Sequence, residues 1–456
     1  MVSISGIRGV VGSTLIPDVV VKYASAFAEY CDKGTIVIGR DGRITGKSIG
    51  HLVSSTLLQM GCNVTALGIC PTPTVALAVE KTKAAGGISI TASHNPMIWN
   101  GMKFFGKSGL FLDAEENRQL WNIADRSGRT YAPWNKQGRY TLAETFLDQH
   151  IEAVLSIPSV RTDTIRKRQF SVVLDCVNAA GGIIVPKLLR QLGCNITEMN
   201  CDVSGVFAHT PEPIPENLKD LCARVRQVKA DIGIAVDPDV DRLVLIDERG
   251  EPFGEEYTIA NIVQFVLGHQ PKRKSGKGNA VVVNLSTTRA VEDIATSYGY
   301  TTVRTPVGEI NVAKKMKEIG AVVGGEGSGG VILPEVHLGR DAIVGIALTL
   351  QHLAEFGGTM SELKKKFPQY SITKGKVELG KLNPDRALTY IRDKFGNRGR
   401  VNTDDGLKID FADSWVHLRK SNTEPVIRII AEAPEKKVAS ELVKDFTKEI
   451  RSVPAT

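Results

Sequence analysis

The amino-acid sequence predicts an α/β protein of four domains, the last of which is of the α+β class. The chain has 456 residues, which is too many for one hydrophobic core. Short runs rich in valine and isoleucine alternate with amphipathic stretches through most of the sequence, a pattern typical of βαβ units and largely parallel sheets. From residue 376 onward the alternation gives way to strands flanked by helices, which favours an α+β unit.

Local patterns locate the individual elements. The expected strands are the apolar runs at 35–39, 171–175, 231–237, 280–284, 413–419 and 426–432. Amphipathic helices are expected at 47–60 and 289–298, and a connecting helix within 141–157. A turn at 247–256 precedes a further helix, and 364–375 is expected to be a linker. These boundaries give predicted domains at residues 1–135, 150–250, 251–366 and 372–456.

One pattern repeats inside the chain. The stretches "LLQMGCNVTALG" (57–68) and "LRQLGCNITEMN" (189–200) each end a helix at glycine and then begin a strand, and 294–308 is a weaker third copy. Helix, glycine, strand is also the commonest order of elements in α/β proteins. Duplication and coincidence are therefore both open interpretations of the repeat.

Composition limits the class of function. The chain is 42% hydrophobic and 23% charged, and its net charge of +7 is not gathered into a basic block, so we expect no nucleic-acid partner. Because no apolar run approaches the roughly 20 residues of a membrane span, we expect no membrane association. Seven scattered cysteines without a Cys-x-x-Cys pair, and an N-terminus without a signal-peptide pattern, indicate reduced thiols and a cytoplasmic protein.

The first candidate site is the segment "TASHNP" at 91–96. Ser93 follows a predicted strand, and the ends of strands are where α/β proteins place their chemistry. A serine hydroxyl is a weak nucleophile without a base, and His94 and Lys103 are both candidates for that base. The alternative is a hydrogen-bonded turn without chemistry. The segment does not match the G-x-S-x-G pattern of hydrolases.

The second candidate is a group of three carboxylates, Asp237, Asp239 and Asp241, in the turn between two apolar strands. Carboxylates at this spacing repel one another unless a cation lies among them, and Mg²⁺ prefers oxygen ligands. Arg242 is placed to hold a phosphate or a carboxylate. The same string fits a phosphatase in which Asp237 is the nucleophile and Asp239 the acid and base. A solvated acidic hairpin is the third interpretation.

The third candidate is the glycine-rich stretch "GGEGSGGVILPE" at 324–335. It satisfies the dinucleotide pattern G-x-G-x-x-G, but the proline-containing segment after it does not supply the helix that holds a pyrophosphate. Glu326 and Ser328 on a glycine-rich backbone suit the hydroxyl groups of a sugar instead. A flexible surface loop is the alternative.

The fourth candidate is a set of phosphate-binding donors in "LRKSNTEPVIRI" at 418–429: Arg419, Ser421, Asn422, Thr423 and Arg428. Guanidinium, hydroxyl, amide and backbone donors together suit a phosphate group that does not react. On its strand, Arg428 is expected to point to the same side as Val426 and Ile430. A capped turn with two unrelated surface arginines is the alternative.

Together these motifs resemble the α-D-phosphohexomutase family, which includes phosphoglucomutase, phosphomannomutase and phosphoglucosamine mutase. "TASHNP" is similar to its phosphoserine loop, "DPDVDR" to its magnesium loop, "GEGSGG" to its sugar-specificity loop and "RKSNTEP" to its phosphate-binding loop. "SGIRG" with Arg8 and "RTPVG" with Thr305 and Gly308 match as well. All six motifs occur in the family's order, and the resemblance covers almost the whole chain.

The resemblance implies four domains around a central cleft, the first three of which are related α/β units with mixed sheets. It implies an enzyme that interconverts hexose 6-phosphate and hexose 1-phosphate through a phosphoserine and a bisphosphorylated sugar, as a monomer or homodimer. The implied catalytic residues are Ser93, His94, Lys103, Arg8 and Arg242, with Mg²⁺ held by Ser93, Asp237, Asp239 and Asp241. The implied substrate-binding residues are Thr305, Gly308, Glu326, Ser328, Arg419, Ser421, Asn422, Thr423 and Arg428.

Two departures from the family pattern bear on the choice of sugar. Many bacterial members have a histidine where this chain has Gly330, and His337 is a possible replacement. Many relatives have a basic residue after the "TPVG" stretch, where this chain has Glu309, Ile310 and Asn311. The loops are most similar to phosphoglucosamine mutase of archaeal type, so glucosamine phosphate is the first choice and mannose or glucose phosphate the alternative. A phosphatase using Asp237 is a more distant alternative, and a sugar-phosphate sensor is disfavoured because nucleophile and metal ligands are all present.

Overall fold

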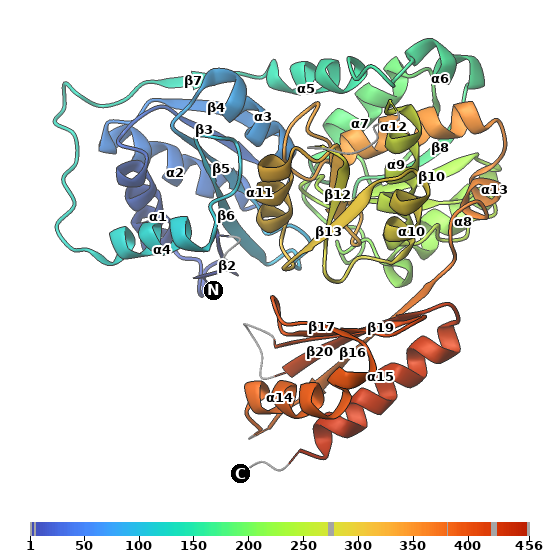
Figure 1. Cartoon of the computed structure of the whole chain (residues 1–456). Helices are drawn as coiled ribbons and strands as arrows, with labels where there is room; N and C mark the ends of the chain where they lie inside the picture. The colour runs from blue at the N-terminus through green and yellow to red at the C-terminus, as the bar shows by residue number, and fades with distance from the viewer. Residues whose placement is uncertain (1, 4–5, 272–277, 381, 421–425, 454–456) are drawn as a thin grey trace.

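The computed structural model describes residues 2–3, 6–271, 278–380, 382–420 and 426–453, which form four domains, each built on one sheet. Figure 1 shows the first domain, in blue, beside the second and third domains, which overlap in this view, and the fourth domain below them. Within the described ranges, no helix is both long enough and apolar enough to cross a lipid bilayer. The predicted α/β class, with a different C-terminal unit, is confirmed.

The first domain has a seven-stranded sheet in the order β1-β2-β6-β5-β3-β4-β7. Its strands are β1 (Val2–Ser3), β2 (Gly6–Val10), β3 (Ile36–Arg40), β4 (Val64–Ile69), β5 (Gly86–Ile90), β6 (Trp99–Gly106) and β7 (Tyr140–Leu142). Its helices are α1 (Pro17–Tyr30), α2 (Gly46–Met60), α3 (Thr72–Thr82) and α4 (Ala114–Asp125). A capping box at Asp113 and Glu116 fixes the start of α4.

The second and third domains each have a four-stranded sheet. The second contains α5 (Phe146–Leu155), α6 (Thr162–Arg168), β8 (Ser171–Asp175), α7 (Gly181–Gln191), β9 (Asn195–Met199), α8 (Lys219–Val228), β10 (Ile232–Val236) and β11 (Leu243–Ile246). The third contains α9 (Glu255–His269), β12 (Ala280–Asn284), α10 (Ala290–Ser297), β13 (Thr301–Thr305), α11 (Glu309–Ile319), β14 (Val323–Glu326), β15 (Gly330–Ile332), α12 (Ala342–Phe356) and α13 (Met360–Lys364).

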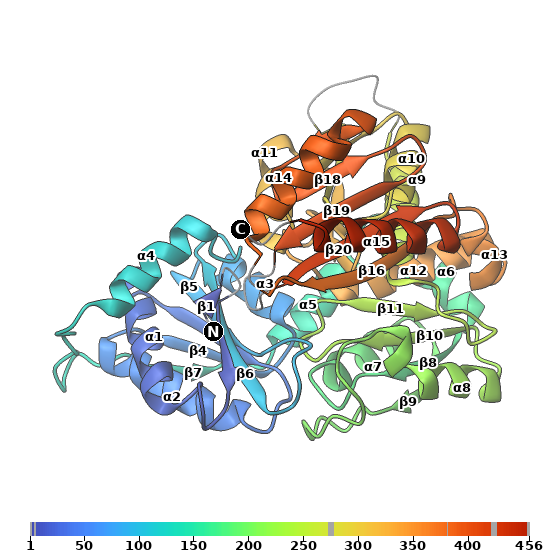
Figure 2. The ribbon, with the colours of Figure 1, turned by 90° about the horizontal axis from the view of Figure 1, so that it is seen from below.

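The fourth domain is an antiparallel sheet in the order β16-β20-β19-β18-β17, packed against two helices (Figure 2). Its elements are β16 (Ser371–Glu378), α14 (Pro384–Phe395), β17 (Arg400–Asn402), β18 (Leu407–Asp410), β19 (Trp415–Lys420), β20 (Val426–Ala433) and α15 (Lys436–Arg451). The expected linker at 364–375 is shorter than predicted, because Ser371 already begins β16. The polar, alternating sequence of that strand pairs with β20 through its backbone.

One arrangement of four strands recurs in the first three domains: β6-β5-β3-β4, β11-β10-β8-β9 and β15-β14-β12-β13. Within each set, counted in chain order, the first strand (β3, β8 or β12) pairs in parallel with both the second and the third. The fourth strand pairs antiparallel with the third. The repeated stretches at 57–68, 189–200 and 294–308 all fall where a helix leads into the second of these strands. The three domains are related, as the resemblance implied.

This repeat explains how three of the motifs come together. The serine, carboxylate and glycine-rich loops each join the third strand of their domain to the fourth, at β5–β6, β10–β11 and β14–β15. Direct contacts link them: the Ser93 hydroxyl donates to Asp237, and the backbone N–H of Leu243 donates to the carbonyl of Gly329 at 2.9 Å. Equivalent loops of three related domains therefore form one site.

Candidate active site

A cavity of about 360 Å³ lies where the four domains meet, and residues of all four domains line it. The first domain contributes Arg8, Ser93, His94 and Lys103, and the second contributes Arg242. The third contributes Gly308, Glu309, Glu326, Ser328 and Arg340, among others, and the fourth contributes Lys374, Arg419 and Ile430. Residues from opposite ends of the sequence thus line one cavity.

The serine loop has a strained conformation that hydrogen bonds from Arg43 stabilise. Ser93 is buried and has a φ of 49°, a left-handed value that is uncommon for a residue with a side chain. The guanidinium of Arg43 donates to the carbonyl of Ser93 at 2.6 Å, and to the carbonyls of Asn95, Pro96 and Trp99 at 2.7–2.8 Å. Asp41 pairs with Arg43 at 3.0 Å. The loop is therefore fixed by a buried arginine that sequence reasoning did not single out.

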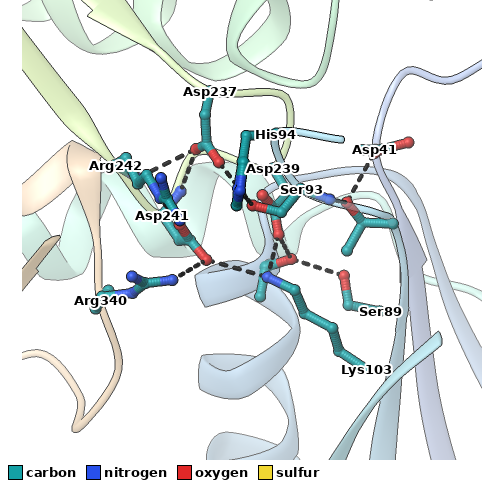
Figure 3. A network of polar contacts seen from close by, with 12 residues as sticks. Asp41, Ser89, Ser93, His94, Lys103, Asp237, Asp239, Asp241, Arg242 and Arg340 are labelled. Carbon is teal, nitrogen blue, oxygen red and sulfur yellow. Dashed lines mark hydrogen bonds and ion pairs between the residues drawn. The ribbon is translucent and has the colours of Figure 1, made fainter. Parts of the chain in front are cut away.

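The side chain of Ser93 faces both a carboxylate and an imidazole (Figure 3). Its Oγ donates to Asp237 Oδ2 at 3.0 Å and lies 3.3 Å from Nδ1 of His94. Burial lowers the pKa of His94 to about 2, and the nearby cations Arg242 and Arg8 act in the same direction. His94 is therefore neutral, and a negative group on Ser93 would favour its protonation.

The three carboxylates of the second domain are completely buried. Lys103 Nζ donates to Asp239 Oδ2 at 2.6 Å and to Asp241 Oδ2 at 3.0 Å. Burial opposes the charge of Lys103, but these two carboxylates outweigh it and raise the pKa of the ammonium. Burial, together with the repulsion of Asp241 and Asp239, raises the pKa of Asp237 well above its usual range. Lys103, Arg242 and Arg340 all contact this group of carboxylates, yet the pKa of Asp237 stays raised.

The donor set fits a hard divalent cation. Oδ1 of Asp239 and Oδ1 of Asp241 are buried and have no hydrogen-bond partner among the described residues. Together with Asp237 they offer oxygen atoms that lie within 4.8 Å of one another. Buried polar atoms are nearly always satisfied, so unpaired carboxylate oxygens beside Ser93 are what a Mg²⁺ site requires.

The sugar-loop carboxylate is more constrained than the sequence suggested. Oε1 of Glu326 accepts from Asn284 Nδ2 at 2.8 Å and from the backbone N–H of Gly308 at 3.0 Å. Oε2 accepts from Arg340 Nη1 at 2.8 Å. Ser328 lines the cavity, whereas the hydroxyl of Thr305 donates to the carbonyl of Pro306 and its side chain does not line the cavity.

The far end of the cavity belongs to the fourth domain. Arg419 lines it and pairs with Asp405 at 2.8 Å. Arg428 lies opposite Arg419 on β20, but its side chain is exposed and does not line the cavity. The predicted residues Ser421, Asn422 and Thr423 lie outside the described residues.

The structure also answers the question about His337. This residue is buried and its Nε2 lies 3.0 Å from Asp341 Oδ2, to which His150 Nε2 also binds at 2.7 Å. His337 does not line the cavity and is not placed to replace a histidine at position 330. Arg340, three residues further along the chain, lines the cavity instead, and sequence reasoning did not single it out.

Comparison with known proteins agrees with this geometry. Models of the phosphoglucomutase/phosphomannomutase alpha/beta/alpha domains I, II and III and of the C-terminal domain match residues 2–130, 148–250, 256–370 and 374–449. The chain belongs to the phosphoglucomutase/phosphomannomutase family. It is a phosphohexomutase, and thus an isomerase.

Individual relatives span nearly the whole chain. A probable phosphoglucosamine mutase of Methanopyrus kandleri is 35% identical over 452 residues, which are 98% of this chain and 97% of the relative. A phosphoglucomutase/phosphomannomutase of Thermococcus kodakarensis is 36% identical over 447 residues, 96% of each chain. A crystal structure of a family protein from Burkholderia thailandensis has a TM-score of 0.85 at 27% identity and covers 99% of this chain and 98% of that one.

Proposed function

We propose that this phosphohexomutase interconverts the 6- and 1-phosphates of glucosamine through a phosphoserine at Ser93. The observation that carries the proposal is the shared cavity, in which Ser93 and Arg419 line one space with Glu326 and Ser328. A hexose bisphosphate needs one end at a reacting hydroxyl and the other in an anion-binding pocket. Ser93 is the proposed reacting hydroxyl, and Arg419 belongs to the proposed anion-binding pocket.

In the proposed reaction the phosphoryl group of Ser93 passes to the free hydroxyl of the sugar phosphate. The bond from phosphorus to Ser93 Oγ breaks as the bond to the sugar oxygen forms, and the hydroxyl proton goes to a base. The bisphosphorylated sugar then turns over and returns its other phosphoryl group to Ser93. We assign the proton to His94, which is neutral and adjacent to Ser93, rather than to Lys103, which two carboxylates keep charged.

The chain's own residues prepare the site for this transfer. Asp237, Asp239 and Asp241 would hold Mg²⁺ beside Ser93, and the ion would supply positive charge to the transferring phosphoryl group. Arg8 and Arg242 line the same cavity and add positive charge there. The buried Arg43 keeps the Ser93 loop in position before substrate arrives.

The choice of glucosamine draws on several archaeal relatives that are named probable phosphoglucosamine mutase. Mannose and glucose phosphates are the second candidate, favoured by the relative named phosphoglucomutase/phosphomannomutase. A coupled assay of 1-phosphate to 6-phosphate conversion across glucosamine, mannose, glucose and N-acetylglucosamine distinguishes them. We expect the highest kcat/KM with glucosamine 1-phosphate, and a higher value with mannose or glucose would reverse the assignment.

A phosphatase that uses Asp237 is disfavoured by the contacts of that residue. Its Oδ1 accepts from the backbone N–H groups of Asp241 and Arg242 at 3.1 and 3.2 Å, and its Oδ2 accepts from Ser93. Both oxygens are thus engaged. Mass spectrometry of the purified protein separates the two chemistries, because a phosphoserine survives neutral hydroxylamine and an aspartyl phosphate does not.

We also propose that the protein acts in the cytoplasm as a monomer or homodimer, without nucleic-acid or membrane partners. All seven cysteines are free thiols, in keeping with a reducing compartment. Light scattering on the purified protein gives the oligomeric state, and a tetramer or larger assembly would contradict this part of the proposal.

A further inference from the structure

We infer that Arg340 is a positioning residue of this site, which orients the sugar-loop carboxylate Glu326 and limits how strongly Asp241 attracts a divalent cation. The inference rests on the proposed function, because it takes the cavity as the site of a sugar phosphate and Mg²⁺. It concerns a side chain outside the four loop motifs.

One guanidinium joins three parts of the cavity wall. Nη2 of Arg340 donates to Asp241 Oδ2 at 2.8 Å, Nη1 to Glu326 Oε2 at 2.8 Å and Nε to Glu309 Oε2 at 3.0 Å. The side chain is only 10% exposed, so solvent screens these pairs little. Figure 3 shows Arg340 and Lys103 reaching the Asp241 carboxylate from opposite sides.

Gly330 makes the space that Arg340 occupies. A Cβ atom at position 330 would lie 2.3 Å from Cδ and 3.0 Å from Cγ of Arg340, which is closer than carbon atoms approach. The backbone of Gly330 is outside the left-handed region, so the stem of Arg340 is the main obstacle to a side chain there. A histidine at 330 and Arg340 in this position therefore exclude each other.

Glu309 binds both the backbone and the side chain of Arg340. Its Oε1 accepts from the backbone N–H of Arg340 at 2.9 Å, while its Oε2 binds the guanidinium. Gly330, the first departure from the family pattern, thus makes room for Arg340, and Glu309, the first residue of the second departure, orients it.

The charges predict two effects of opposite direction. Without Arg340, Asp241 would keep Lys103 at 3.0 Å and Arg242 at 3.8 Å but would lose its third cation, and Glu326 would lose its ion pair with Arg340. The extra negative charge would attract a divalent cation more strongly and repel a dianionic sugar phosphate. General damage to the fold would instead weaken the binding of the cation and the binding of the sugar phosphate alike.

The test measures Mn²⁺ binding and substrate KM separately on the full-length protein. Electron paramagnetic resonance counts free Mn²⁺ without substrate, so this readout is independent of activity. For Arg340→Gln we expect the Mn²⁺ dissociation constant to fall about fivefold or more, and the KM for glucosamine 6-phosphate to rise about tenfold. Arg340→Lys should restore Mn²⁺ binding towards the parent but keep KM raised, because an ammonium group lacks the fork that spans two carboxylates.

Gly330→Ala perturbs the same contact without removing the charge from the protein, and it should shift both constants in the same directions by smaller factors. Gly50→Ala in α2 is the matched control, because its Cβ would meet only Ile90 at 3.6 Å. Unchanged or weaker Mn²⁺ binding in folded Arg340→Gln and Gly330→Ala would overturn the inference. A parent enzyme without mutase activity whose variants still show the Mn²⁺ shift would instead refute the proposed function alone.

Discussion

The two ends of the cavity are built differently. At the Ser93 end, the reacting groups are buried, and Lys103 lies between Asp239 and Asp241 at 2.6 and 3.0 Å. One hydrophobic cluster joins the three domains that supply this end, running from Val37 through Val172 to Val281, and the first domain has a second cluster of its own. The reactive groups are therefore fixed before substrate binds.

At the Arg419 end, the fourth domain has its own core. Polar groups link it to the third domain. Oγ of Ser286 lies 2.9 Å from Nδ1 of His417, and the backbone N–H of Val307 donates to Oδ2 of Asp405 at 2.9 Å. Such contacts are readily exchanged for water, whereas a shared core is not. We therefore expect substitution of the reacting group Ser93 to act on kcat, and substitution of Arg419 at the other end to act on KM.

The largest expected effect is at Ser93 itself. Ser93→Ala removes the oxygen that carries the phosphoryl group, so kcat should fall about 10⁴-fold or more, while binding of the sugar phosphate measured by calorimetry changes little. Isomerisation at the parent rate would show that the nucleophile lies elsewhere.

Lys103→Met tests the buried charges of the same end. Removing one partner of a buried pair leaves uncompensated carboxylates, so the free energy of unfolding in urea should fall by about 3–5 kcal/mol. Lys22→Met is the control, because its pair with Asp125 has side chains 40% and 72% exposed, and about 1 kcal/mol or less is expected. Equal losses in the two variants would contradict the contrast between buried and exposed pairs.

Arg419→Met tests the far end. A charge-assisted hydrogen bond to phosphate contributes about 1.5–3 kcal/mol, so KM should rise about 10- to 100-fold while kcat stays within a fewfold of the parent. Steady-state kinetics separates the two constants. A fall in kcat at constant KM would place Arg419 with the reacting groups and remove the difference between the ends.

The smallest effect concerns the histidine pair behind the cavity. Burial lowers the pKa of His337, but the hydrogen bond and charge of Asp341 outweigh it and raise the pKa above its usual 6.5. Protonated His337 therefore stabilises the fold fully below pH 6.5, and this contribution is lost as pH rises through the raised pKa. The difference in Tm between the parent and His337→Gln should be larger at pH 6 than at pH 9, and a difference that grows with pH would contradict this sign.

The loops of the candidate site could be picked out from the sequence because each motif is a short string at the end of a strand. Ser93, Asp237 and Glu326 all line or adjoin the cavity, although their strings lie far apart. The parts that sequence reasoning missed act over long separations. Arg43 supports a loop 50 residues away, and Arg340 binds Asp241 across 99 residues. Neither contact leaves a local pattern, so only the folded chain reveals these two arginines.

The most direct test of the account follows labelled phosphate through a single turnover. Protein carrying ³²P on Ser93 is mixed with excess glucosamine 6-phosphate, and the label is traced by rapid quench. The account predicts that the label leaves Ser93 and appears in the bisphosphorylated sugar at least as fast as steady-state turnover. Label that stays on Ser93 during turnover, or is released as inorganic phosphate, would contradict it.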